Sequence, residues 1–337
     1  MRGDPLTPQQ LQRAREQLPP FGDNAPPSPE LEAFCRTYGL DFTTPLPQVG
    51  YQVGHIQSGE FTLAVHQWRQ YDARANLLLV HGYFDHSGLF NKLIAWGLAH
   101  HCNVLIFDLP GHGLSSGEPA VIDDFGDYSR AIDAVLKATS LPPLPWWAMA
   151  QSTGGAALVD YARKYNWPFA ATVLLAPLVH PAKWASVSAA HLLLSPFIQS
   201  VERKFSINSS DREFLHFIQR DPLQSRRTSL RWVGALRRWL RSLARRDLGV
   251  GAALIIQGDA DATVDWRYNV GFVSALFPGS RVEYLTGAGH QLANEAESYR
   301  RIYLASVVAW LAQCGIALDD AAEFSSSNSS SNSASQE

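Results

Sequence analysis

Cysteine is scarce in this sequence, and its few positions exclude two classes of protein. Only Cys35, Cys102 and Cys314 occur among the 337 residues. Their odd number and wide separation fit neither a disulfide framework nor the paired spacing of a structural zinc site. We therefore expect reduced thiols in a cytoplasmic protein, each packed in the interior rather than reactive.

Long apolar runs and a large net charge are also missing. No run reaches the roughly 18 apolar residues of a membrane-spanning helix. The polar N-terminal segment, residues 1–20, lacks the apolar core of a signal peptide. The net charge is only −3, so no overall field favours nucleic acid. These absences predict a protein that neither crosses a membrane nor binds nucleic acid.

Charge is nevertheless unevenly placed along the chain. Residues 183–247 contain 13 Lys and Arg against 5 Asp and Glu, a net charge of +8, whereas the remainder carries −11. A basic segment of this size attracts anionic ligands or an anionic lipid surface. We expect a cytoplasmic protein that can also contact the inner face of an anionic membrane through this segment.

Short β-rich runs alternate with helical patterns from residue 51 onward, which predicts an α/β fold with a mainly parallel sheet and helices on both faces. The eight expected strands are 51–56, 61–68, 76–80, 103–107, 146–150, 171–175, 252–256 and 281–285. The expected helices are 90–99, 125–138, 154–164, 266–276 and 296–313. The first two strands are close enough to form a hairpin.

Three segments fall outside this alternation. Residues 1–50 are rich in Pro and Gln, contain one weak helical stretch at 29–38, and are expected to form an N-terminal arm. Within a main domain at 51–324, residues 178–250 show helical periodicity without a strand, which predicts a helical cap over the sheet edge where ligands bind. Residues 325–337 are almost all Ser and Asn, so we expect a disordered tail.

Ser152 is the candidate nucleophile. It follows the apolar run 146–150 and precedes a helical pattern that begins at Gly154. A serine on a sharp strand-to-helix turn needs small neighbours two residues before and after it, and Ala150 and Gly154 meet that need. Such a turn directs the amide of Thr153 and a helix N-terminus toward a developing oxyanion. A helix N-cap serine would explain the same local pattern.

A second signal follows the strand 76–80, where His81-Gly82 lets the backbone turn. The amide of Tyr83 could then face a reacting carbonyl beside the amide of Thr153, so we predict these two as the oxyanion hole. A plain strand-to-helix loop is the alternative. Substrate contacts are predicted for His81, Gly82, His86 and Gln151 around the nucleophile, and for His191 in the cap.

Asp261 and His290 complete the candidate catalytic set. Asp261 lies three residues beyond Gly258 after the strand 252–256, with Asp259 and Asp265 as competitors. His290 follows the flexible turn 286–289 after the last strand, 29 residues past Asp261. A hydroxyl becomes nucleophilic when a histidine takes its proton and a carboxylate orients that histidine. Ser, Asp and His, each after its own strand, follow the chain order of the α/β-hydrolase fold.

Residues 51–313 resemble the monoacylglycerol lipase and lysophospholipase group of α/β-hydrolases, which is also filed with the S33 serine aminopeptidases. Asp108-Leu109-Pro110-Gly111-His112-Gly113-Leu114-Ser115 is similar to the Asp-x-x-Gly-x-Gly-x-Ser loop of that group, and residues 81–88 are similar to its oxyanion loop. Ala150 and Gln151 stand where the group usually has Gly and His. The resemblance implies an eight-stranded hydrolase sheet with a helical cap.

Two cap segments bear on the substrate. Residues 229–246 form one apolar stripe with arginines on the other faces, which fits either a lid helix packed on the core or a helix on an anionic membrane. The apolar residues of 187–198 would either line an acyl-chain pocket or supply the core of the lid. We expect a substrate with one fatty acyl chain, and the basic cap favours a phosphate-bearing headgroup.

These observations predict a serine hydrolase that cleaves esters of single-chain lipids, of lysophospholipase or monoacylglycerol lipase type, through an acyl-enzyme on Ser152. The mechanism requires no metal or organic cofactor. A general carboxylesterase and an aminopeptidase remain alternatives because the fold hosts both. A catalytically silent member that serves as a binding module is the alternative from another class.

Overall fold

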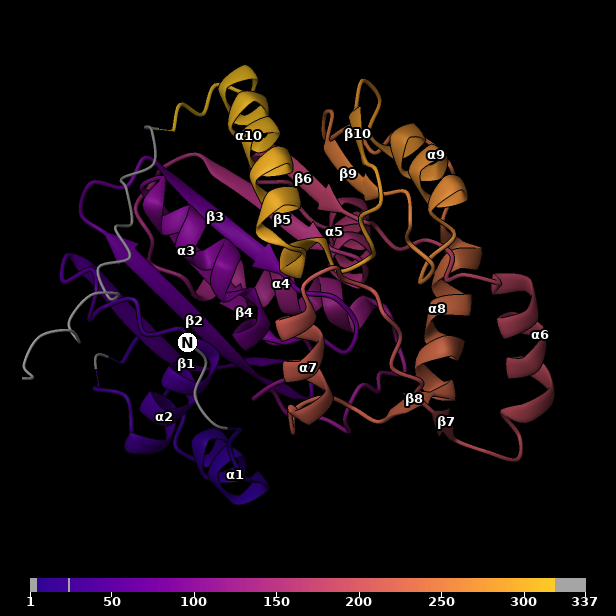
Figure 1. Cartoon of the computed structure of the whole chain (residues 1–337), viewed down its shortest axis with the longest axis horizontal. Helices are drawn as coiled ribbons and strands as arrows, with labels where there is room; N and C mark the ends of the chain where they lie inside the picture. The colour runs from indigo at the N-terminus through magenta and orange to yellow at the C-terminus, as the bar shows by residue number, and fades with distance from the viewer. Residues whose placement is uncertain (1–4, 24, 319–337) are drawn as a thin grey trace, which may run out of the picture.

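An eight-stranded sheet forms the centre of the structure, a computed structural model that describes residues 5–23 and 25–318 (Figure 1). Its strands are β1 (Val49–Ser58), β2 (Phe61–Gln70), β3 (Ala75–Val80), β4 (Cys102–Phe107), β5 (Trp146–Gln151), β6 (Phe169–Leu175), β9 (Leu254–Gly258) and β10 (Arg281–Leu285), in the order β1-β2-β4-β3-β5-β6-β9-β10. The β1–β2 and β2–β4 pairs are antiparallel, and the other pairs are parallel. The predicted mainly parallel sheet is confirmed, and all eight expected strands are present.

Helices cover both faces of the sheet. They are α1 (Pro8–Glu16), α2 (Pro29–Tyr38), α3 (Asn91–Ala99), α4 (Gly126–Ala138), α5 (Thr153–Lys164), α6 (Trp184–Leu194), α7 (Arg212–Arg220), α8 (Leu230–Ser242), α9 (Trp266–Leu276) and α10 (Glu297–Gln313), with short 3₁₀ helices η1 (Ser87–Phe90) and η2 (Leu292–Asn294). Successive side chains of a strand point to opposite faces. On β3, Leu77 and Leu79 therefore pack with α3 and α10, whereas Leu78 and Val80 pack with α4, α5 and α9.

The N-terminal arm contributes to the core on one face of the sheet. Leu11 of α1 and Leu31 and Phe34 of α2 are buried there. Helix α2 matches the weak helical stretch in the sequence, whereas α1 was not expected. The division into an arm at 1–50 and a domain at 51–324 stays a prediction, and its boundary at 324 and the tail at 325–337 lie outside the described residues.

The long connection between β6 and β9 contains α6, α7 and α8, and these elements, with the loops between them, are called the cap here. It also contains an antiparallel pair, β7 (Ser200–Glu202) with β8 (Arg227–Ser229). The expectation of a cap without a strand was therefore wrong. Each of these strands has only three residues, and most of these residues are polar, so neither strand produces the apolar run that marks a strand in sequence.

The two apolar cap segments behave differently from each other. On α8, Trp232, Leu236 and Trp239 are buried against the core. The apolar stripe of this helix is therefore packed on the core, as expected for a lid helix, and does not face a membrane. Helix α6 has no buried residue, and the exposed fractions of Leu193 and Phe197 reach 72% and 84%. Val187 is partly buried against the core, whereas residues 192–198 are exposed, so most of the segment 187–198 supplies no lid core. No helix in the described parts of the chain is long and apolar enough to span a bilayer.

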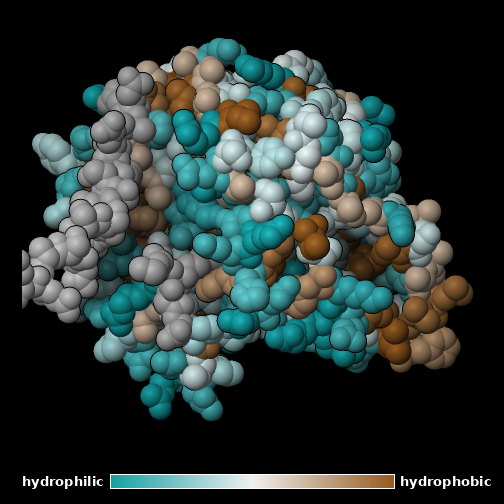
Figure 2. All heavy atoms as spheres, in the orientation of Figure 1, coloured by the Kyte–Doolittle hydropathy of each residue, from teal (hydrophilic) through white to brown (hydrophobic). Residues whose placement is uncertain are grey.

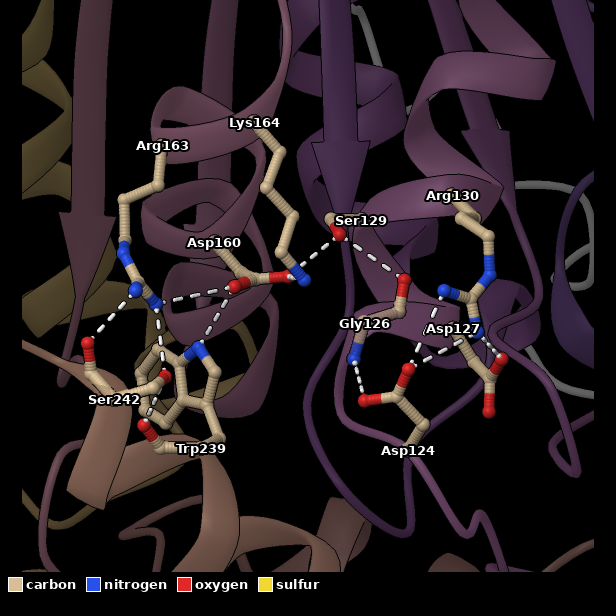
Figure 3. Close-up of polar contacts among 10 residues, drawn as sticks. All are labelled: Asp124, Gly126, Asp127, Ser129, Arg130, Asp160, Arg163, Lys164, Trp239 and Ser242. Carbon is tan, nitrogen blue, oxygen red and sulfur yellow. Dashed lines mark hydrogen bonds and ion pairs between the residues drawn. The ribbon is translucent and has the colours of Figure 1, made fainter.

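A buried carboxylate fastens α8 to the hydrolase core (Figure 3). Asp160 of α5 is fully buried and accepts hydrogen bonds from Ser129 Oγ of α4 at 2.6 Å and from Trp239 Nε1 of α8 at 2.9 Å. Lys164 Nζ lies 2.8 Å from the same carboxylate. Because a buried charge is costly unless several donors surround it, this junction fixes α8 over the sheet edge.

Candidate active site

Ser152 occupies the turn between β5 and α5, and its backbone is strained. Its φ of 52° and ψ of −113° lie in a region that non-glycine residues rarely adopt. Two residues later, a Cβ on Gly154 would lie 2.3 Å from the carbonyl oxygen of Val80 at the end of β3. Only glycine fits this approach of α5 to β3. Ala150, the other small neighbour, is fully buried within β5.

The side chains of Ser152, His290 and Asp261 form one hydrogen-bonded chain. His290 Nε2 lies 2.9 Å from Ser152 Oγ, and His290 Nδ1 lies 2.7 Å from Asp261 Oδ2. All three residues are buried, with exposed fractions of 7%, 4% and 7%. If Nδ1–H donates to Asp261, Nε2 is free to take the serine proton, which is the arrangement that a nucleophile and its base require.

Burial and charge oppose each other at His290. Burial disfavours the imidazolium form, but the Asp261 carboxylate and its hydrogen bond outweigh that cost, so the pKa of His290 lies above its ordinary value. For Asp261, burial alone would raise the pKa, but His290 and the amide of Thr263 hold it below the ordinary value. The site therefore stabilises the ion pair that forms when His290 accepts a proton.

The two competing carboxylates have other partners. Asp259 Oδ1 accepts a hydrogen bond from the amide of Gly287 at 2.7 Å. Asp265 caps the N-terminus of α9, where Oδ1 accepts from the amide of Tyr268 at 3.3 Å. Among these three carboxylates, Asp261 is the one that contacts His290.

Tyr83 and Thr153, whose amides are the predicted oxyanion donors, line the same cavity as Ser152. Thr153 is the first residue of α5, and a Cβ on Gly82 would lie 3.4 Å from Ser152 Cβ. Neither amide donates to an acceptor among the described residues. Unpaired amides at a helix N-terminus attract negative charge. The Tyr83 ring stacks on Trp232 of α8 with centroids 3.9 Å apart, which fixes this loop against the cap.

Asp108 holds together the loops that follow β3 and β4. Its Oδ1 accepts from the amide of Ser87 and its Oδ2 from the amide of Leu114, both at 2.7 Å. The conformation needs Gly113, because φ is 52° there and a Cβ would lie 2.1 Å from Asp108 Oδ2. The Asp-x-x-Gly-x-Gly-x-Ser pattern therefore encodes a scaffold beneath the oxyanion loop.

A cavity of about 460 Å³ opens beside Ser152 and His290 and extends beneath the cap. One group of lining residues is apolar, namely Leu178, Pro181, Trp184, Val187, Trp232, Val233 and Val264. A second group is polar or charged, namely Glu202, Arg203, Lys204, Ser206, Asn208 and Gln291. Of the apolar segment 187–198, Val187 is the residue in this wall. The cavity thus offers an apolar lining together with a basic one.

None of the five residues for which substrate contact was expected is part of the cavity wall. His81 is fully buried, with Nδ1 2.8 Å from the Gly82 carbonyl oxygen and Nε2 accepting from the Leu109 amide at 2.9 Å. Burial lowers the pKa of His81 to about 3, so the ring stays neutral. His191 lies 3.3 Å from Arg237 at the contact between α6 and α8. We assign both rings to the framework of the site.

Gln151 and His86 are likewise framework residues. Gln151 Nε2 donates to the His290 carbonyl oxygen at 2.8 Å, and its Oε1 accepts from the Ala293 amide at 3.3 Å. The side chain thus fixes the loop that carries the base. His86 is buried against Asp221 of the cap, with Nε2 2.8 Å from Oδ2. Gly82 also lies outside the cavity wall, but its backbone borders the nucleophile.

Sequence reasoning missed two polar residues of the site. Arg203 lies in the cavity wall and covers the ring of Phe84 at 3.8 Å. Glu295 is fully buried and accepts from the Gly289 amide at 2.7 Å, next to the base. Neither stands in a recognisable motif, because each acts through contacts between distant segments. In the described residues, no three His, Cys, Asp or Glu side chains gather as a metal site.

The chain is similar in sequence and in fold to known hydrolases. A family model described as serine aminopeptidase, S33, matches residues 71–297. The monoglyceride lipase of Mus musculus is 27% identical over 258 residues, covering 71% of this chain and 82% of that protein. Phospholipase YtpA of Bacillus subtilis is 22% identical over 242 residues, covering 68% and 93%. A solved monoglyceride lipase from Saccharomyces cerevisiae shares the fold, with a TM-score of 0.66 at 16% identity, covering 77% and 94%.

The raised pKa of His290 predicts a pH profile. Only neutral His290 can accept the Ser152 proton, so kcat/KM for a short, water-soluble ester should rise with pH through a midpoint above about 6.5, the ordinary value for histidine. Asp261→Asn removes the carboxylate, which should move the midpoint to lower pH and reduce kcat by roughly 10⁴-fold. Asp259→Asn is the matched control and should retain both. An unmoved midpoint in Asp261→Asn, or equal losses in the two variants, would contradict this assignment.

Proposed function

The chain belongs to the serine aminopeptidase S33 family of hydrolases, and we propose that it cleaves the ester bond of single-chain lipids through an acyl-enzyme on Ser152. The observation that carries the proposal is the buried Ser152–His290–Asp261 chain beside a partly apolar cavity. The names of the relatives support a lipid ester, since one is a monoglyceride lipase and another a phospholipase.

In the proposed reaction, Ser152 Oγ attacks the ester carbonyl carbon while His290 Nε2 accepts the hydroxyl proton. The amides of Tyr83 and Thr153 donate to the oxyanion of the tetrahedral intermediate. The carbon–oxygen bond to the alcohol then breaks, and His290 protonates the leaving alcohol. Water attacks the acyl-enzyme with His290 again as base, which releases the fatty acid and restores Ser152.

The alternatives considered from sequence have weaker support. A silent binding module would not need a base within 2.9 Å of the serine and a carboxylate within 2.7 Å of the base. For a general carboxylesterase or an aminopeptidase, no described feature of the cavity is a better fit than for a lipid ester. The apolar lining from α6 and α8 is suited to an acyl chain.

A fluorophosphonate probe tests the catalytic part of the proposal. The folded wild-type protein should form one covalent adduct and hydrolyse monoacylglycerol, whereas Ser152→Ala should lose both because the nucleophile is gone. Intact-protein mass spectrometry measures the adduct, and heat-unfolded wild type is the control for nonspecific labelling. An adduct that persists in folded Ser152→Ala would overturn the assignment.

Arg203 supports a finer proposal, that the enzyme prefers a phosphate-bearing headgroup. Its guanidinium is partly buried in the cavity wall between Phe84 and Phe205, at 3.8 and 4.5 Å from their ring centroids. Its described hydrogen-bond acceptors are neutral, namely Gln224 Oε1 and the Ser225 carbonyl oxygen. Burial lowers the pKa of Arg203 to about 10, although the charge of the buried Asp85 opposes this shift.

The headgroup proposal predicts a selective loss. With acyl chains matched, Arg203→Gln should lower kcat/KM for a lysophosphatidate at least tenfold and that for the neutral monoacylglycerol less than twofold, because only the former offers the guanidinium an anionic partner. Arg226→Gln, which removes an exposed cap arginine, is the matched control and should change neither. Equal turnover of both lipids by wild type and Arg203→Gln would contradict the headgroup preference.

Helix α6 and the residues just after it support a further part of the proposal, peripheral docking on an anionic bilayer. Figure 2 shows apolar residues gathered where Figure 1 places α6, and Leu192, Leu193 and Phe197 are exposed. Helix α8, which packs beside α6, exposes Arg238 and Arg241. Apolar side chains flanked by arginines match the interfacial region of an anionic membrane.

Vesicle co-sedimentation tests the docking surface. The double variant Leu193→Asp and Phe197→Asp should bind phosphatidylserine-containing vesicles at least tenfold more weakly than wild type, because carboxylates replace the inserted side chains. Ile302→Asp, which alters an exposed apolar residue of α10, should bind like wild type. Two results together would contradict membrane docking: wild type does not bind the vesicles, and it forms a dimer that the double variant does not form. The surface would then contact a second copy of the chain.

A further inference from the structure

The N-terminal arm reaches the oxyanion loop through a buried hydrogen-bond network that lies partly outside the family match. The matched segment begins at residue 71, whereas α2 ends at Tyr38. Tyr38 and His86 are fully buried, and Asp221 is 3% exposed. These three residues come from the arm, the loop after β3 and the cap, so one cluster joins three segments far apart in the sequence.

Asp221 is the centre of this network. Its Oδ1 accepts from Tyr38 Oη at 2.7 Å and from the Leu223 amide at 3.0 Å, and its Oδ2 lies 2.8 Å from His86 Nε2. His86 Nδ1 accepts from the Gly88 amide at 3.2 Å, so Nε2 carries the proton that points to Asp221. The buried Asp221 carboxylate is stabilised by all three donors. If one donor is lost, we expect the carboxylate and the remaining donors to shift, because an unsatisfied buried charge is costly.

The ring of Tyr38 also presses on the loop backbone. A Cβ on Gly88 would lie 2.6 Å from Tyr38 Cγ, so the arm packs directly on this glycine. The rings of Tyr38 and His86 meet edge to face with centroids 4.8 Å apart. His86 caps η1 and lies three residues after Tyr83, which lines the cavity beside Ser152 and carries the predicted oxyanion donor. A shift of His86 would therefore also displace the Tyr83 amide, because only a short, tightly packed stretch of chain separates them.

We propose that Tyr38 is a positioning residue for the oxyanion hole, through which the N-terminal arm sets the rate of acylation. The hydroxyl fixes Asp221, Asp221 fixes His86, and His86 with the Tyr38 ring holds the loop that presents the Tyr83 amide. Tyr38 does not touch the substrate. The inference rests on the proposed function, because it takes Ser152 as the nucleophile. It concerns how the oxyanion hole is positioned, not which ester is cleaved.

Tyr38→Phe tests this role while keeping the ring that packs on Gly88. Loss of an oxyanion donor costs about 10²–10³-fold in kcat. A donor that is displaced rather than lost should cost about tenfold, with KM unchanged, because the hole acts in the transition state. Asp221→Asn should lower kcat in the same way, and the double variant should be no worse than the more impaired single variant, since both act through one network.

Tyr51→Phe is the matched control. Tyr51 of β1 also places its hydroxyl against α2, 3.3 Å from Cys35 Sγ, and 2.8 Å from His66 Nδ1. Its contacts do not include the oxyanion loop. Tyr51→Phe should therefore lower the thermal midpoint about as much as Tyr38→Phe but leave kcat within twofold of wild type. If the two variants lose equal stability and Tyr38→Phe retains full kcat, the contact is structural only and the inference fails.

The rate of fluorophosphonate labelling of Ser152 separates this inference from the proposed function. Attack of Ser152 on phosphorus with loss of fluoride also develops negative charge on an oxygen in the hole. Tyr38→Phe should slow labelling about tenfold relative to Tyr51→Phe, whatever the natural ester. Unchanged labelling in Tyr38→Phe overturns the inference even if lipid hydrolysis is established, and slowed labelling supports it even if no lipid ester is cleaved.

Discussion

The strained backbone of Ser152 is the constraint on which the site depends. A φ of 52° is unfavourable for a residue with a side chain, by about 1–3 kcal/mol, so the surrounding structure must hold it. The Ser152 amide donates to the Leu175 carbonyl oxygen of β6 at 2.9 Å, and its own carbonyl oxygen accepts from Leu178 at 3.1 Å. The parallel sheet thus holds the turn from a neighbouring strand, and the nucleophile is positioned before any substrate binds.

The cap contributes to the site as well as covering it. Trp232 of α8 stacks on Tyr83, and Gln224 donates to the Phe84 carbonyl oxygen at 2.7 Å. Phe84 has a φ of 70°, a second strained position, and it directly follows Tyr83, the residue that carries the predicted oxyanion donor. The cap, which the buried Asp160 holds at α8, therefore supports the same loop that Asp108 holds from the side of the sheet. Movement of the cap would alter the oxyanion hole together with access to the cavity.

The sequence predicted the sheet well because its strands are covered on both faces. Runs such as Leu77–Val80 are wholly buried, so their continuous apolar character is visible without knowledge of the fold. The residues that make up the Ser–His–Asp chain could be named because each follows a strand and parallel strands end at one edge. Their catalytic roles stay predictions until the variants are measured. The cap was less accessible, since α6 and α8 are both apolar in sequence and only packing decides which is covered.

The role of Gln151 could not be predicted from the sequence. It stands where the group that this chain resembles usually has histidine, and the sequence alone predicted a substrate contact there. In the structure its amide donates to the His290 carbonyl oxygen and accepts from the Ala293 amide. A neutral imidazole also offers one donor and one acceptor, so the replacement keeps the same pair of hydrogen-bonding capacities. The Gln151 side chain therefore holds the loop that carries His290, the predicted base.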